Sequence, residues 1–196
     1  MRPIQRLLVV AATLLFAGHT ASAAPKATSK KKFHFELAAV TAKPEVNADV
    51  AKAATPRVEL QIKKAFESHP QLVAKLEGAP AKSATDAYRK YLVKKGVAGA
   101  YLVTVEVTEA SEEVVPMDKP NTQRLVVRVA VHILGETIPG RTMGFTGDGQ
   151  ATIKQEVGKK VRERDREYAW DSAAEVAIAD AMKTVFKQLA VPPKKQ

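Results

Sequence analysis

Residues 125–134 read LVVRVAVHIL and alternate regularly between two kinds of position. Every second residue is large and apolar: Leu125, Val127, Val129, Val131 and Ile133. The positions between them include the polar residues Arg128 and His132. Because successive side chains of a strand point to opposite faces, this pattern predicts a β-strand that buries one face and leaves the other more polar.

Similar alternation occurs on both sides of this stretch. It covers residues 33–38, 101–108 and 143–157, and residues 72–76 are a further short candidate. Strands with one apolar face are typical of antiparallel sheets. The sequence therefore predicts an antiparallel sheet of about four to five strands.

Two features interrupt the strand pattern. Residues 112–123 contain two prolines and no periodicity, which predicts a loop. The tripeptide Gly147-Asp148-Gly149 is either a β-bulge or a hairpin turn. We favour the bulge because the alternation keeps its phase across these three residues.

Three segments carry helical signals. Thr55-Pro56 predicts a helix start, and Ser68-His69-Pro70 predicts its end. Residues 84–95 and about 165–190 carry apolar residues at helical spacing. The last segment has many alanines on its apolar face, so we expect it to approach the sheet closely. Together these elements predict an α+β fold, with the helices packed on one face of the sheet.

The two ends have the composition of segments outside a folded domain. Residues 1–23 combine a basic start, an apolar run and the site Ala21-Ser22-Ala23, which is the pattern of a cleavable signal peptide. In this interpretation residues 24–32 are a basic flexible linker, 33–190 a single α+β domain and 191–196 a disordered tail. We therefore expect a soluble protein that is periplasmic or secreted. The sequence contains no cysteine, the residue that bacterial lipoproteins acylate, so we also expect that it is not a lipoprotein.

The formal net charge of +10 is concentrated in these ends. Lysines occupy positions 26, 30, 31, 32, 194 and 195, and neither end segment contains an acidic residue. A nucleic-acid-binding protein more often carries its positive charge on the folded surface, so nucleic acid is not an expected partner. The basic ends either aid solubility or adhere to anionic envelope material such as phospholipid or wall polymer.

The sequence contains no motif that indicates an enzyme. No serine lies in G-x-S-x-G, no H-E-x-x-H is present, and there is no cysteine to act as nucleophile or metal ligand. Carboxylates cluster at Glu106, Glu109, Glu112, Glu113 and Asp118. We expect no enzymatic activity, no cofactor and no catalytic or metal-binding residue. The alternative is a hydrolase of cell-wall or peptide substrates that uses these carboxylates or His132.

Four side chains mark the more polar face of the predicted sheet. They are Thr104, Glu106, Arg128 and His132. Glu106 and Arg128 could form an ordinary cross-strand pair on the surface. Alternatively, the four residues form a surface on which a partner docks, which makes them the candidate partner-facing site.

The order of the elements resembles that of small bacterial envelope domains. The resemblance rests on Thr55-Pro56, on the strand LVVRVAVH over residues 125–132 and on the helix AAEVAIADAM over residues 173–182. In this pattern the chain is similar to the curli-secretion lipoprotein, the penicillin-binding-protein activator lipoprotein and the N-terminal domain of TolB, but it lacks the acylated cysteine of the lipoproteins. The resemblance implies a non-enzymatic domain that binds envelope proteins, and it assigns no functional residue.

These observations lead us to expect an exported cell-envelope protein that acts as a non-enzymatic binding or scaffolding domain. The partner would be an envelope protein or an anionic envelope polymer. The two alternatives are the hydrolase and a protein that adheres to anionic surfaces through its basic ends.

Overall fold

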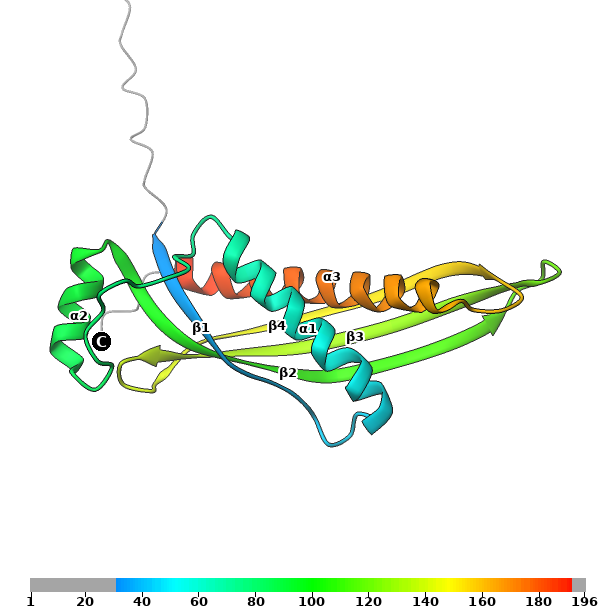
Figure 1. The fold of residues 1–196 in the computed structure, drawn as a ribbon, viewed down its shortest axis with the longest axis horizontal. Coiled ribbons are helices and arrows are strands. Elements are labelled where there is room, and N and C mark those ends of the chain that lie inside the picture. The colour runs from blue at the N-terminus through cyan, green and yellow to red at the C-terminus, as the bar shows by residue number, and fades with distance from the viewer. Residues whose placement is uncertain (1–30, 192–196) are drawn as a thin grey trace, which may run out of the picture.

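The computed structural model describes residues 31–191, which form three helices and a four-stranded sheet (Figure 1). The elements in chain order are β1 (Lys32–Ala42), α1 (Ala48–Ser68), α2 (Thr85–Lys94), β2 (Val97–Pro116), β3 (Thr122–Ile138), β4 (Met143–Gly158) and α3 (Glu163–Ala190). The predicted α+β class is confirmed. The predicted signal peptide, the linker as far as residue 30 and the tail beyond Val191 lie outside the described residues.

The strands lie in the order β1-β2-β3-β4. β2, β3 and β4 pair antiparallel, as predicted, but β1 pairs parallel to β2, so the sheet is mixed. A parallel pair requires a long connection, and here α1 and α2 supply it. Alternation within a strand does not reveal the direction of its neighbour. The short strand expected over residues 72–76 is reduced to a single bridge between Leu72 and Phe33.

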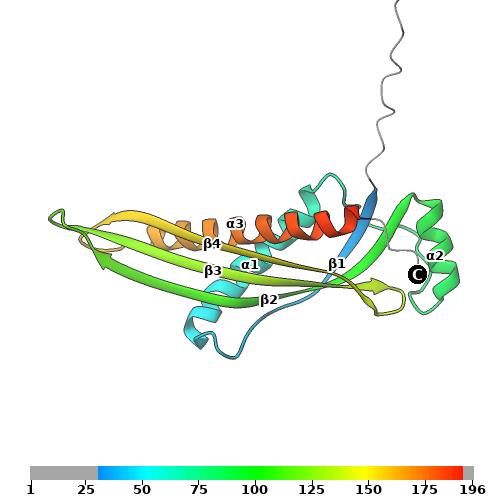
Figure 2. The same ribbon diagram turned by 180° about the vertical axis from the view of Figure 1, so that it is seen from behind.

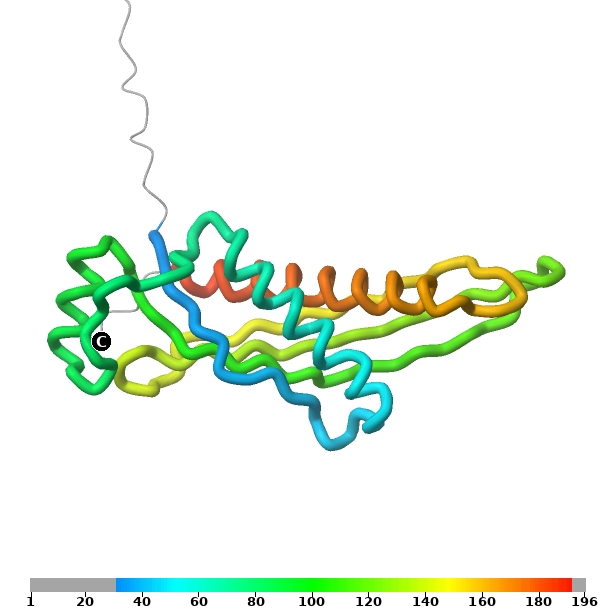
Figure 3. The backbone as a smooth tube through the Cα atoms, viewed as in Figure 1, coloured from blue at the N-terminus to red at the C-terminus, as the bar shows by residue number. Residues whose placement is uncertain are grey.

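The loop expected over residues 112–123 is instead the end of a long hairpin, which the tube in Figure 3 shows clearly. β2 continues to Pro116, and β3 begins at Thr122. The register of the pair shifts between Val107 and Glu109. Such an irregularity exchanges the faces on which later residues lie, so the alternation loses its phase there and no longer predicts a strand.

Helices α1 and α3 cover one face of the sheet, and Figures 1 and 2 show this layer from both sides. The fully buried side chains beneath them include Val103, Val105, Val127 and Val131 on the strands and Ile62 and Ile178 on the helices. Trp170 is also buried, at 4% exposure, as its place on the apolar stripe predicts. None of the described helices combines the length and the apolar character needed to cross a membrane.

Gly147 and Gly149 are neither a bulge nor a hairpin turn. They pair in continuous register with Ile133 and Val131 in the middle of β4. A Cβ atom added to Gly149 would lie 2.1 Å from the carbonyl oxygen of Ala177 on α3. The two glycines therefore allow the backbone of α3 to lie directly against β4, which is the close approach that the alanine-rich helix predicted.

Helix α1 begins at Ala48, seven residues before the predicted start at Thr55. The side chain of Asn47 caps it by accepting from the backbone N–H groups of Asp49 and Val50. Pro56 lies inside the helix, where its ring prevents one backbone hydrogen bond. The side chain of the neighbouring Arg57 donates from Nη1 to the carbonyl oxygen of Ala53 at 2.7 Å.

Helix α2 packs at one end of the opposite face of the sheet, so not all helices share one face. Tyr88 and Leu92 of α2 contact Ala100 and Ile138 in a second small core. His34 of β1 is also buried, and its Nδ1 lies 2.7 Å from the carbonyl oxygen of Val73. Because a carbonyl oxygen only accepts, Nδ1 of His34 carries the proton.

Candidate functional site

The candidate site is the part of the sheet that neither α1 nor α3 covers, which we call the open sheet face. It is defined by Thr104 and Glu106 on β2, Arg128 and His132 on β3, and Asp148 on β4. These residues alternate along their strands with core residues such as Val105, Val129 and Gly147. The four residues singled out by the sequence therefore lie on one face.

Three polar residues form a row across the open sheet face. Glu106 and His132 are directly paired on β2 and β3, and His132 is paired with Asp148 on β4. Nδ1 of His132 lies 2.7 Å from Oδ1 of Asp148. The side chain of Asp148 is 81% exposed, so the row is open to solvent and to a partner.

Arg128 belongs to a different part of the same face. It lies four residues from His132 on β3, about 13 Å at roughly 3.3 Å per strand residue. Its ion-pair partner is Glu113, with Nη1 and Oε2 separated by 3.8 Å, and not Glu106. The structure thus brings Glu106 and His132 together but separates Arg128 from them.

The carboxylates that could have served a glycosidase are divided between the two faces of the sheet. Glu106 lies on the open sheet face, whereas Glu112 points to α3. There, Nε1 of Trp170 donates to Glu112 Oε2 at 2.9 Å, and Nε of Arg166 donates to Oε1 at 2.7 Å. Glu112 is therefore a structural acceptor for the helix. Within residues 31–191, no group of three or more histidine, aspartate or glutamate side chains is placed to hold a metal ion.

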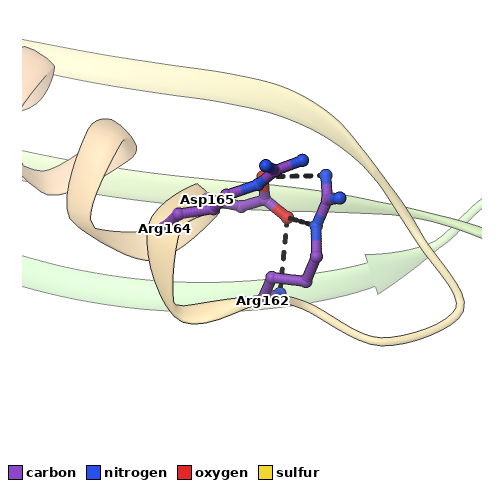
Figure 4. A network of polar contacts seen from close by, with 3 residues as sticks. All are labelled: Arg162, Arg164 and Asp165. Atoms are coloured by element: carbon purple, nitrogen blue, oxygen red, sulfur yellow. Dashed lines mark hydrogen bonds and ion pairs between the residues drawn. The ribbon is translucent and has the colours of Figure 1, made fainter.

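Asp165 has an altered pKa, but its surroundings are those of a helix cap (Figure 4). The Arg162 side chain donates from Nε to Oδ2 at 2.9 Å and from Nη2 to Oδ1 at 3.2 Å. Arg164 Nε lies 3.8 Å from Oδ1. The side-chain hydrogen bonds from Arg162 are the main reason why the pKa of Asp165 lies below its usual value of 3.8. The carboxylate stabilises the start of α3.

This cap predicts an acid-dependent contribution to stability. Because the pKa of Asp165 is lower in the folded state, its stabilisation is present above about pH 4 and is lost as the pH falls through the folded pKa. Urea unfolding at several pH values should show the Asp165→Asn variant to be less stable than wild type at neutral pH, with the difference shrinking in acid. Asp180→Asn, at an exposed position of α3, is the control. A pH-independent difference for Asp165→Asn would contradict the prediction.

Sequence reasoning missed two residues of the open sheet face. The sequence predicts a bulge or turn at Asp148 and a loop at Glu113. Asp148 could have been found from the unbroken alternation of residues 143–157, which places it on the same face as Gln150 and Thr152. No sequence signal places Glu113, because the register shift after Val107 is set by pairing with β3.

Comparison with known proteins gives similarity of fold only. No family model matches the chain, and no curated protein matches it. A protein of Xanthomonas campestris described as DUF330 is 8% identical, with a TM-score of 0.44, and covers 83% of this chain and 88% of its own. A minor lipoprotein of Acinetobacter baumannii is 9% identical, with a TM-score of 0.38, and covers 79% and 96%. The rare lipoprotein B of Shewanella oneidensis is 11% identical, with a TM-score of 0.38, and covers 80% and 96%.

These descriptions agree with the expected class of bacterial envelope domain, but not with the specific families that the sequence resembles. They also require a correction. Four of the matching structures are described as lipoproteins, which conflicts with the expectation of a periplasmic or secreted protein that is not a lipoprotein. That expectation depended on the absence of cysteine from residues 1–196, and we withdraw it.

Proposed function

We propose that this chain is a non-enzymatic binding or scaffolding domain of the cell envelope, and that a protein partner docks on its open sheet face. One observation carries the proposal. Beyond the end that α2 covers, the sheet face opposite α1 and α3 presents paired polar side chains rather than a sealed core.

The chemistry of the open sheet face suits recognition of a polar surface. Acidic and basic groups alternate on it, with Glu106 and Asp148 around His132, and Glu113 beside Arg128. Such a pattern favours a partner of complementary charge and penalises one that places like charges opposite. Backbone pairing holds these side chains on rigid strands, so little conformational entropy is lost when a partner binds.

Charge reversal on this face tests the proposal. Arg128→Glu with Lys154→Glu changes two basic residues of β3 and β4 on the open sheet face. Affinity capture from an envelope extract should then recover the partner at least about tenfold less well than wild type, because like charges would meet across the interface.

The matched control changes the same charge on the other side of the molecule. Lys52 and Lys63 are exposed on α1, so Lys52→Glu with Lys63→Glu should leave capture unchanged. Equal recovery by both double variants would contradict the proposal. Turnover of a wall substrate by the purified wild-type protein would instead favour the hydrolase.

A further inference from the structure

The C-terminal ends of α1 and α3 lie close together (Figure 1). Residues from both segments line an apolar groove there, away from the open sheet face. It has a volume of about 700 Å³. Apolar side chains from both segments form most of its lining: Ala65, Pro70, Ala179, Met182, Phe186 and Ala190. The ring of His69 stacks on Phe186, with centroids 3.8 Å apart, and completes the floor.

The charged side chains that line this groove are basic. Lys183 and Lys187 lie one helical turn apart on α3, and no aspartate or glutamate is among the lining residues in the described part of the chain. Glu67 lines a separate depression. The groove thus combines an apolar floor with a cationic wall.

The N-terminal end of the described chain adds to the positive charge at this end of the molecule. The backbone oxygen of Lys31 accepts from Gln71, the residue next to Pro70, and Val191 directly follows Ala190. Lys31 and Lys32 are both exposed.

We propose that this basic groove docks on a bilayer surface that contains anionic phospholipid. Lysine side chains near a membrane surface are attracted to anionic headgroups, and their aliphatic stems can lie along apolar surface while the ammonium groups reach the phosphates. The exposed small residues Pro70, Ala179 and Ala190 contact the acyl boundary beneath the headgroups. A second copy fits less well, because a symmetric contact through this groove would bring Lys183 and Lys187 against the same residues.

This inference goes beyond the proposed function, because it uses a different surface and needs no protein partner. Purified protein is therefore mixed with vesicles of equal parts phosphatidylglycerol and phosphatidylcholine, and binding is measured by flotation. Wild type should bind, and high salt should release it. Lys183→Gln with Lys187→Gln should weaken binding about 25-fold, since each lysine contributes roughly fivefold at an anionic surface.

The control removes the same charge from the opposite end of α3. Lys159 and Lys160 are exposed before the start of that helix, so Lys159→Gln with Lys160→Gln should bind nearly as well as wild type. Equal weakening by both double variants would show that only net charge matters and would overturn the proposal. Equal binding of wild type to pure phosphatidylcholine vesicles would overturn it as well.

The absence of cysteine allows a direct test of the apolar contact. Ala179→Cys places a thiol at an exposed position of the groove wall, and Thr152→Cys places one at an exposed position of β4. Each is labelled with a polarity-sensitive fluorophore. The emission maximum of the label at position 179 should shift to shorter wavelength on vesicle binding, and that of the label at position 152 should not. A shift at Thr152 alone would assign membrane contact to the open sheet face and refute the proposal.

Discussion

Gly149→Ala should lower the free energy of unfolding by about 3 kcal/mol, although it adds only one methyl group. The added Cβ would lie 2.1 Å from the carbonyl oxygen of Ala177 and 2.5 Å from the backbone nitrogen of Ala181. Both atoms belong to the backbone of α3, so no change of side-chain rotamer can relieve the overlap. The helix would have to move away from β4, and the close packing of its alanine face would be lost.

Gly158 provides the control for this substitution. It lies at the end of the same strand, and a Cβ added there would meet no atom within 4 Å. Gly158→Ala should therefore change the stability by less than about 0.5 kcal/mol. Chemical denaturation of both variants, followed by circular dichroism, measures the difference. If the two variants were equally stable, α3 would not lie against Gly149 as the structure describes.

These glycines show where sequence reasoning succeeds and where it stops. The alanine stripe of α3 correctly predicts that this helix lies close to its neighbour. The Gly-Asp-Gly sequence alone does not identify that neighbour, because the same residues are typical of turns and bulges. Only the structure shows that Gly147 and Gly149 make room for the backbone of α3.

Local signals also failed where a tertiary feature outweighed them. The alternation predicts β3 and the first half of β2, but the shift after Val107 hides the second half. Thr55-Pro56 is a strong start signal, yet Asn47 caps α1 earlier, and the helix continues through the proline. The direction of β1 relative to β2 depends on the path of α1 and α2, which connect the two strands. The sequence of β1 itself does not indicate this direction.

The candidate site was predicted in part for a similar reason. Strand periodicity places Thr104, Glu106, Arg128 and His132 on one face, because each lies in a segment whose phase is unbroken. The pairing of those side chains depends on register between strands. A Glu106–Arg128 pair is one of the two interpretations that the sequence allows, whereas the structure pairs Arg128 with Glu113.

Phe35→Ala should be at least as destabilising as Gly149→Ala, with a loss of about 3–5 kcal/mol in the free energy of unfolding. Phe35 is 6% exposed, and its ring contacts aromatic rings from four other elements. These are Phe66 on α1, Tyr101 on β2, Phe145 on β4 and Phe186 on α3, with centroids 5.4, 5.8, 5.1 and 5.9 Å away. Truncation would therefore leave a cavity where both helices meet the sheet.

The position of Phe35 makes this loss more than a local one. β1 is an edge strand held by a single parallel neighbour, and Phe35 joins it to α1 and α3. Val40→Ala, at a half-buried site on the same strand, should lower the free energy of unfolding by only about 1 kcal/mol. Urea denaturation of the two variants provides the comparison.

Since the ring of Phe186 stacks on Phe35 and lines the basic groove, Phe35→Ala should also weaken vesicle binding. A fully stable Phe35→Ala protein would show that the aromatic cluster does not hold β1 and the groove together.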